Sequence, residues 1–283
     1  MLNDDQKRAF DEEGYILLPD FKSADELQSL KARAHRIACS HDIDAHRDVF
    51  STDRQKGPQA DRIQDYFLNS ANEIRCFFED SAFDEDGALV QPLELSINKI
   101  GHALHDLDPV FDGFSHGPKL AELARDLGLE RPQIWQSMYI FKQPRIGDQV
   151  GWHQDTGFFM TTPQSVTTFW FAIDDATLEN GCLWVEKGGH RGPLRQQFIR
   201  EGHKTRLIDL DTTPWPDKRS AIPVQVKAGS LLVFNGMLPH YSAPNRSDKP
   251  RNAYTLHVTD GQCAYDPQNW IQRGKDLPVR GFV

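Results

Sequence analysis

The sequence predicts a mainly β protein with flanking helices, in which the strands form a double-sheet core of the β-sandwich or jelly-roll type. Short apolar and β-branched runs recur between turn signals in the second half of the chain, whereas helical patterns lie mostly in the first half. The length of 283 residues fits one large domain or two small ones. Because the two patterns segregate along the chain, we expect one domain over residues 1–283, with a helical part of about 1–130 and a jelly-roll core of about 131–262.

A capping-box pattern at the N-terminus predicts the first helix. Asn3 is followed three residues later by Gln6, the spacing at which each side chain can bond the backbone N–H of the other residue. The helix should end at Gly14, since glycine tolerates the positive φ of a helix C′ position. The apolar run of residues 15–18 that follows is typical of a strand.

A second capping box, Ser23 with Glu26, predicts a longer helix that extends toward Cys39 with an apolar stripe on one side. Residues 41–65 are polar and have no period, so we expect an irregular, mobile loop that could act as a lid. The aromatic-rich residues 66–83 fit no single period.

A last helical pattern over residues 118–127 precedes six predicted strands. Turn signals such as Gln143-Pro144 and Asn180-Gly181 separate the strands. The strands cover residues 134–141, 166–173, 181–185, 222–226, 230–234 and 252–258.

The composition limits the kinds of partner and the cellular compartment that we expect for this protein. A formal net charge of −9 and a pI of about 5.6 disfavour a nucleic-acid partner, which would need a basic surface. The N-terminus lacks the apolar run of a secretory signal, and no stretch approaches the roughly 20 apolar residues that span a bilayer. The four cysteines lie far apart and form no CxxC pair, as is typical of free thiols in a reducing compartment. We therefore expect a cytoplasmic protein that acts on a small molecule, with no nucleic-acid or membrane partner.

Three residues have the types and the spacing of a metal site. His153 and Asp155 are two positions apart, so in extended backbone their side chains project to the same face. His240 follows an apolar strand in the run LLVFNGMLPH, where a ligand can lie at a strand end. Two imidazoles and one carboxylate on one face of a metal leave its other positions open, which is the facial triad of Fe(II) oxygenases. Each residue alone is more often structural, so the interpretation depends on the set.

Arg251 adds a second element to the predicted site. It stands eleven residues after His240, at the start of the run RNAYTLHV. A dicarboxylate co-substrate that chelates iron through its keto-acid end needs a buried cation for its far carboxylate, and a guanidinium fork suits that role. Ser242 could add a hydroxyl to the same carboxylate. The combination predicts an Fe(II) enzyme that uses 2-oxoglutarate.

Several stretches resemble the phytanoyl-CoA dioxygenase family of Fe(II)/2-oxoglutarate oxygenases. They are WHQDT, FAIDDATLENGCLWVEKGGH, the opening FDEEGYILLPDFKSADEL, and His240 followed by Arg251. The segments SINKIGHALHDLDPVF and QSMYIFKQP are more narrowly similar to the phytanoyl-CoA dioxygenase domain-containing proteins, a branch of that family. The resemblance covers nearly the whole chain and is least clear over residues 41–65.

The resemblance implies a double-stranded β-helix, the cupin-like form of the jelly roll, with iron held by His153, Asp155 and His240. The positions that match the family's 2-oxoglutarate contacts are Lys99, Met138, Trp170, Ser242 and Arg251. The implied reaction is hydroxylation of a C–H bond of a small organic substrate with O₂, in which 2-oxoglutarate becomes succinate and CO₂ and ascorbate serves as an activator. Without the resemblance, Lys99 would be a solvated strand residue, and Met138 and Trp170 would be core residues.

Other interpretations stay open at this point. The same three ligands could hold zinc or manganese and activate water in a hydrolase, which has no need of a buried arginine. They could also belong to a silent metal-binding jelly roll, and within the oxygenase class desaturation is an alternative to hydroxylation. The family's Pro-Gly-Ser-His turn is replaced here by residues 186–190, EKGGH, where His190 fits a structural role. The basic run of residues 191–206 is either a solvated face or a clamp for an anionic arm of the substrate.

Overall fold

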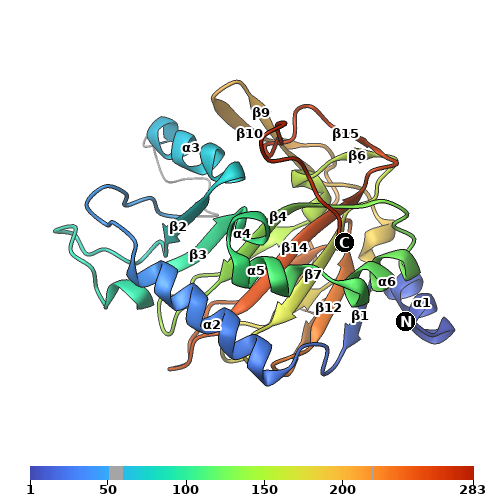
Figure 1. Cartoon of the computed structure of the whole chain (residues 1–283), viewed down its shortest axis with the longest axis horizontal. Coiled ribbons are helices and arrows are strands. Elements are labelled where there is room, and N and C mark those ends of the chain that lie inside the picture. Colours follow the sequence, from blue (N-terminus) through green and yellow to red (C-terminus); the bar gives the residue numbers. More distant parts are fainter. Residues whose placement is uncertain (51–59, 218) are drawn as a thin grey trace.

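The structure, a computed structural model, describes residues 1–50, 60–217 and 219–283. Two antiparallel sheets form its centre, and Figure 1 shows the strands of the larger one side by side from β2 to β1. The major sheet has the strand order β1-β12-β7-β14-β4-β3-β2, and the minor sheet has the order β11-β8-β13-β5. From β4 onward the chain crosses repeatedly between the two sheets, and this winding confirms the expected double-stranded β-helix.

The strands of the major sheet are β1 (Tyr15–Leu18), β2 (Ile74–Phe78), β3 (Ile97–His102), β4 (Pro132–Ile140), β7 (Thr167–Ala172), β12 (Leu231–Asn235) and β14 (Ala253–Asp260). The strands of the minor sheet are β5 (Val150–His153), β8 (Leu183–Val185), β11 (Ile222–Val224) and β13 (His240–Ser242). Two smaller antiparallel pairs join β9 (Gln196–Glu201) to β10 (Lys204–Asp209) and β6 (Thr161–Thr162) to β15 (Ala264–Tyr265). The helices are α1 (Asp4–Glu13), α2 (Ala24–Cys39), α3 (Ala60–Asn69), α4 (Leu104–Leu107), α5 (Pro109–Ser115) and α6 (Pro118–Asp126).

The N-terminal caps form as the sequence predicts. Asn3 and Gln6 make the reciprocal bonds of a capping box, and α1 ends at Gly14 with φ 85°. Ser23 and Glu26 make the second box at the start of α2. These local contacts satisfy backbone N–H groups that a helix terminus leaves unpaired.

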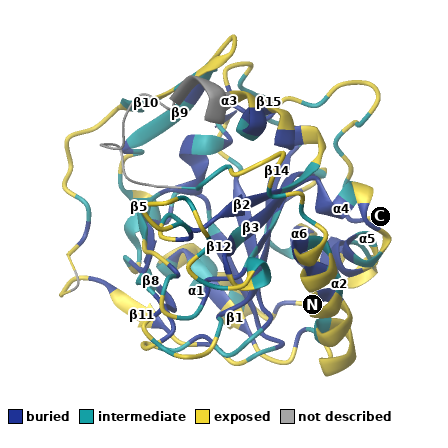
Figure 2. Cartoon of the chain, turned by 90° about the vertical axis from the view of Figure 1, so that its left-hand side faces the viewer, coloured by how far each residue is buried: buried dark blue, intermediate teal, exposed yellow. Residues whose placement is uncertain are grey.

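The helices cover one face of the major sheet, because the strands alternate in the residues they present. On β7, Phe169 and Phe171 face the helices, whereas Trp170 and Ala172 face the minor sheet. Apolar residues of α2, α5 and α6 pack on the first face, and each fully buried large apolar side chain contributes about 1.5–3 kcal/mol there. Figure 2 shows the resulting layers, with the strands of the major sheet buried and much of α2 exposed. The other face of the major sheet is left for the minor sheet and for the site.

Two expectations need correction. The irregular segment was expected to reach residue 65, but α3 begins at Ala60, and its last turn places Phe67 and Leu68 in an apolar cluster with Trp270. Residues 51–59, the centre of the expected lid, lie outside the described residues. Besides the predicted strand β1, the first 130 residues supply β2 and β3 to the major sheet, so the N-terminal region is more than a helical layer. Short β5 and β13, which carry the two site histidines, were not among the predicted strands.

Candidate active site

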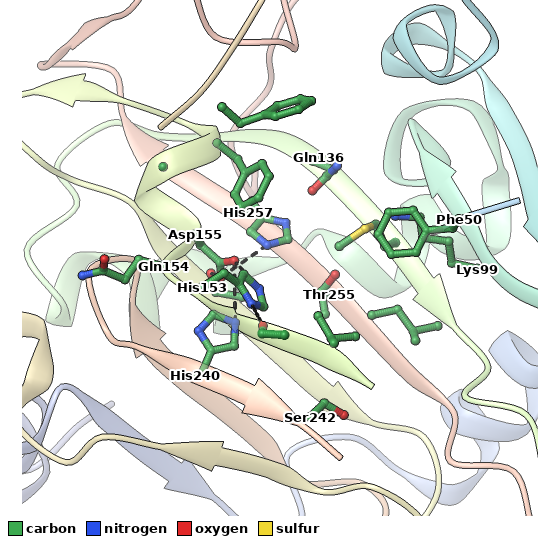
Figure 3. Close-up of a pocket in the computed structure, with 18 of the residues that line it drawn as sticks. Phe50, Lys99, Gln136, His153, Gln154, Asp155, His240, Ser242, Thr255 and His257 are labelled. Atoms are coloured by element: carbon green, nitrogen blue, oxygen red, sulfur yellow. Dashed lines mark hydrogen bonds and ion pairs between the residues drawn. The ribbon is translucent and has the colours of Figure 1, made fainter. Parts of the chain in front are cut away.

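His153 and His240 face each other across the minor sheet. The register of β5 and β13 places them directly opposite, with ring centroids 4.0 Å apart. Asp155 lies two residues after His153, where the chain leaves β5 and begins a 3₁₀ turn over Asp155–Phe158. One potential ligand atom from each residue lies within 4.8 Å of the other two (Figure 3). The strand register thus brings together the three residues singled out from the sequence.

Backbone carbonyl groups orient both imidazoles. Nδ1 of His153 is 2.8 Å from the oxygen of Gly151, and Nδ1 of His240 is 3.0 Å from the oxygen of Leu238. Because a carbonyl oxygen only accepts, each Nδ1 carries the proton and each Nε2 presents a lone pair. The two Nε2 atoms lie 3.5 and 3.7 Å from Oδ1 of Asp155. Burial, reinforced by the charge of His240, lowers the pKa of His153 to about 4, so it is a neutral donor at neutral pH.

The carboxylate of Asp155 is charged and fixed. Burial alone would raise its pKa, but His240 and His257 outweigh burial and hold the pKa below the usual range of an aspartate. Oδ2 accepts a hydrogen bond of 2.5 Å from Oγ1 of Thr168 and lies 3.5 Å from Nε2 of His257. Two imidazoles and one oriented carboxylate are a donor set that fits a divalent transition metal.

Arg251 is a buried cation with unused donors. Its Nη2 donates to Oγ of Ser242 at 3.0 Å, and that hydroxyl donates in turn to the backbone oxygen of Gly181 at 3.0 Å. Nε and Nη1 have no hydrogen-bond partner among the described residues, although the side chain is only 2% exposed. Burial lowers the pKa of Arg251 to about 10, so the guanidinium remains charged at neutral pH. An anion placed beside it would satisfy both orphaned N–H groups.

All eight residues predicted for the site line one cavity of about 840 Å³. They reach it from both sheets, since Lys99, Met138 and Trp170 project from β3, β4 and β7 of the major sheet. Trp170 also lies under the guanidinium of Arg251, 5.5 Å from its ring centroid to the guanidinium carbon. Met138 and Trp170 are therefore cavity wall as well as sheet packing.

Lys99 lies at the other end of the cavity from the three potential metal ligands (Figure 3). Its ammonium is 3.2 Å from the ring centroid of Phe50. Burial lowers the pKa of Lys99 to about 7. Lys99 is thus a buried donor at the cavity wall and not a solvated strand residue.

The sequence did not point to several polar residues of the cavity wall, among them His257, Thr255 and Gln136. The two-residue alternation of a strand could have predicted two of them. Thr255 and His257 follow Arg251 by four and six positions, so their side chains lie on the same face as that of Arg251. Oγ1 of Thr255 and Nδ1 of His257 are buried and have no hydrogen-bond partner among the described residues.

The structure also places His190 and the basic run. Nε2 of His190 lies 3.0 Å from the backbone oxygen of Asp11, so this histidine ties the turn after β8 to the end of α1. The basic run of residues 191–206 is not one exposed face, since Arg195 is 4% exposed, lies 3.4 Å from Glu186 and covers the ring of Trp215. The rest of the run continues into the β9–β10 hairpin beside the cavity.

A double-stranded β-helix with two histidines and an aspartate at one cavity wall defines an enzyme class, the non-haem iron dioxygenases that use 2-oxoglutarate. None of the helices in the described part of the chain has the length and apolar character needed to span a bilayer.

Comparison with known proteins places the chain within that class. The family described as Phytanoyl-CoA dioxygenase (PhyH) matches residues 10–253. The chain is 43% identical over 275 residues to a phytanoyl-CoA dioxygenase of Arabidopsis thaliana, covering 97% of this chain and 95% of the relative. It is 41% identical over 282 residues to phytanoyl-CoA dioxygenase domain-containing protein 1 of Bos taurus, covering 98% and 97%. The chain therefore belongs to the phytanoyl-CoA dioxygenase family.

A solved structure shares the fold. EctD from S. alaskensis, crystallised with 2-oxoglutarate and 5-hydroxyectoine, superposes with a TM-score of 0.65 at 22% identity, covering 100% of this chain and 87% of that one.

Proposed function

We propose that this enzyme hydroxylates a C–H bond of a small organic substrate, with Fe(II) held by His153, Asp155 and His240. In the overall reaction, substrate, O₂ and 2-oxoglutarate give hydroxylated substrate, succinate and CO₂, and ascorbate acts as an activator of the iron. The proposal is supported most strongly by one observation: the three potential metal ligands line the same cavity as Arg251, whose Nε and Nη1 have no hydrogen-bond partner among the described residues. Bound Fe(II) supplies the activation of O₂ and the oxidation of 2-oxoglutarate.

The protein's own residues bind and orient the reactants. Arg251 holds the distal carboxylate of 2-oxoglutarate through its buried N–H groups, and Ser242 adds a neutral donor when its hydroxyl turns from the Gly181 oxygen to that carboxylate. Met138 and Trp170 form the apolar wall along the cofactor, and Lys99 supplies a further cation at the cavity. Thr168 and His257 fix the Asp155 carboxylate, and the aromatic walls exclude water from the reacting atoms.

The chain as a whole supports two further parts of the proposal. Residues 1–283 act as one domain, since strands from the first 130 residues complete the major sheet and contribute Lys99 to the cavity. The four cysteines are free thiols, which supports a reducing, cytoplasmic location.

The alternative is a metal-dependent hydrolase built on the same triad. A hydrolase would use the metal to activate water, and that reaction does not require a buried arginine such as Arg251, whose Nε and Nη1 have no hydrogen-bond partner among the described residues. The test is metal analysis of protein purified without oxygen, followed by calorimetric titration of 2-oxoglutarate into the Mn(II)-loaded and metal-free forms. We expect iron, and 2-oxoglutarate binding that depends on the metal. Zinc in place of iron, together with no 2-oxoglutarate binding, would support the hydrolase.

A further inference from the structure

A buried histidine outside the metal and cofactor sets also reaches the cavity. His102 lies at the end of β3, is 0% exposed and lines the same cavity as the triad. Three aromatic rings surround it, with centroid distances of 5.6 Å to Phe67, 5.5 Å to Phe77 and 5.1 Å to Trp270. The His102 imidazole is therefore a polar group packed among aromatic rings, where the low local dielectric strengthens any hydrogen bond that it makes.

A chain of hydrogen bonds determines which nitrogen of His102 carries the proton. The single hydroxyl proton of Ser70 is donated to the backbone oxygen of Phe67. The Ser70 oxygen, 2.7 Å from Nδ1 of His102, must then accept from that nitrogen. Burial, reinforced by the charge of Lys99, lowers the pKa of His102 well below its usual value, so the ring is neutral. Nε2 is consequently a lone-pair acceptor.

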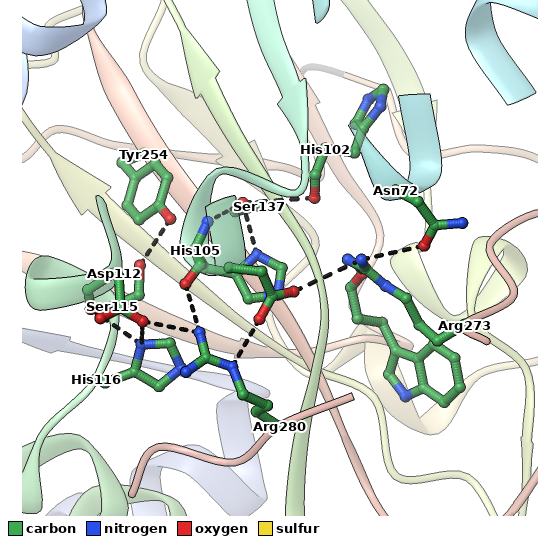
Figure 4. Close-up of polar contacts among 12 residues, drawn as sticks. Asn72, His102, His105, Asp112, Ser115, His116, Ser137, Tyr254, Arg273 and Arg280 are labelled. Atoms are coloured by element: carbon green, nitrogen blue, oxygen red, sulfur yellow. Dashed lines mark hydrogen bonds and ion pairs between the residues drawn. The ribbon is translucent and has the colours of Figure 1, made fainter. Parts of the chain in front are cut away.

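Nε2 of His102 has no hydrogen-bond partner among the described residues. Its neighbour in the chain, His105, points the other way into a polar network, with Nδ1 2.8 Å from Ser137 and Nε2 3.0 Å from Asp106 (Figure 4). The fold thus uses one of these two histidines to tie α4 to the sheet and leaves the other with an open acceptor at the cavity. A buried acceptor without a partner costs free energy unless a ligand supplies a donor.

We propose that His102 recognises the primary substrate through Nε2, and that the substrate carries a hydroxyl or N–H group on an apolar ring that packs against the cavity side of the cluster formed by Phe67, Phe77 and Trp270. The aromatic residues supply the apolar contact, and Ser70 holds the imidazole in the accepting tautomer. The inference rests on the proposed function, since it takes the cavity beside the triad to be the place where the substrate is oxidised.

The first test is the tautomer of His102 in the Zn(II)-loaded full chain with 2-oxoglutarate, read from ¹⁵N chemical shifts of the imidazole. The His102→Phe spectrum assigns the signals. We expect the Nδ1–H form in the wild type and loss of that preference in Ser70→Ala. A protonated Nε2 in the wild type would overturn the proposal.

The second test compares two probes of nearly equal shape, 2-naphthol and 2-methoxynaphthalene, by quenching of tryptophan fluorescence in the same protein. The wild type should bind the hydroxyl probe about tenfold more tightly, equivalent to about 1.4 kcal/mol for the hydrogen bond. His102→Phe should remove the preference, whereas Thr255→Val, which deletes another unpartnered polar atom of the cavity, should keep it. Equal binding of the two probes by the wild type, binding of neither, or loss of the preference in Thr255→Val would each refute the role of His102. Succinate formation by the wild-type enzyme tests the proposed function separately.

Discussion

Replacement of Arg251 by methionine should weaken 2-oxoglutarate binding by about two orders of magnitude. The guanidinium has two N–H groups, Nε and Nη1, without partners among the described residues, and both are buried. A hydrogen bond to a charged group contributes roughly 1.5–3 kcal/mol, so two such bonds at the lower limit contribute about 3 kcal/mol. At 1.4 kcal/mol per factor of ten, that loss corresponds to roughly a 100-fold increase in Kd.

Three further variants separate the effect of the Arg251 charge on 2-oxoglutarate binding from the effect of its hydrogen-bond geometry. Ser242→Ala removes one neutral donor at the same carboxylate and should cost about 1 kcal/mol, or roughly fivefold in Kd. Arg251→Lys keeps the charge but loses the fork, so its Kd should lie between those of Ser242→Ala and Arg251→Met. Arg195→Met is the matched control, because this arginine is equally buried but bonds Glu186 outside the cofactor end of the cavity.

The assay is calorimetric titration of 2-oxoglutarate into the Mn(II)-loaded protein, with thermal melting of the same samples. Without 2-oxoglutarate, Arg251→Met should melt no lower than the wild type, since the substitution removes a buried charge that has no ionic partner among the described residues. With saturating 2-oxoglutarate, the wild type should gain stability and the variant should not. An unchanged Kd in Arg251→Met would remove this residue from the cofactor site.

Three further predictions concern the supports of the site. His257→Phe should weaken metal binding about tenfold or more, measured by competition with a chelator, because His257 contacts the Asp155 carboxylate; equal affinity would show that this contact is incidental. Arg273→Met should lower the free energy of unfolding, measured in urea, by about 3 kcal/mol, because Arg273 and Asp106 form a buried ion pair. Arg280→Met should lower it by only about 1 kcal/mol, because the Arg280 side chain is 44% exposed. Equal losses in the two variants would contradict the argument from burial. Burial alone would raise the pKa of Asp106, but the bond to His105 and the arginine charges hold this pKa at about 2, below the usual 3.8. The charged carboxylate should therefore add roughly 2 kcal/mol to the free energy of unfolding above pH 4, and this contribution should be lost as the pH falls toward 2. Urea unfolding midpoints of Asp106→Asn should not show this loss.

Local rules of the sequence account for much of the fold. The capping boxes at Asn3 and Ser23 depend on residues three apart, so they could be read without tertiary information. The strands β7, β12 and β14 are buried on both faces, and their runs of apolar, aromatic and β-branched residues predict them. Short β5 and β13 could not be found in this way, because their residues serve the cavity on one face and their pairing is set by partners far away in sequence.

The site was predictable where residue type limits the role. His153 and Asp155 combine metal-binding residue types with a two-residue spacing, and His240 and Arg251 add a third potential ligand and a matching charge. The contacts of Lys99 with aromatic rings and the hydrogen bond between Ser70 and His102 depend on chain segments brought together only by folding. Such contacts decide which buried nitrogen has an open lone pair, and sequence spacing carries no information about them.

The most direct test of the central claim is succinate formation from 2-oxoglutarate with Fe(II), ascorbate and O₂ and no added substrate, for the wild type beside His153→Ala. Oxygenases of this class turn over slowly without substrate, so the test needs no knowledge of the substrate. We predict succinate from the wild type and none above background from the variant, since His153 supplies one of the two imidazoles at the triad. Succinate formed at the same rate by His153→Ala would contradict the assignment of the metal site.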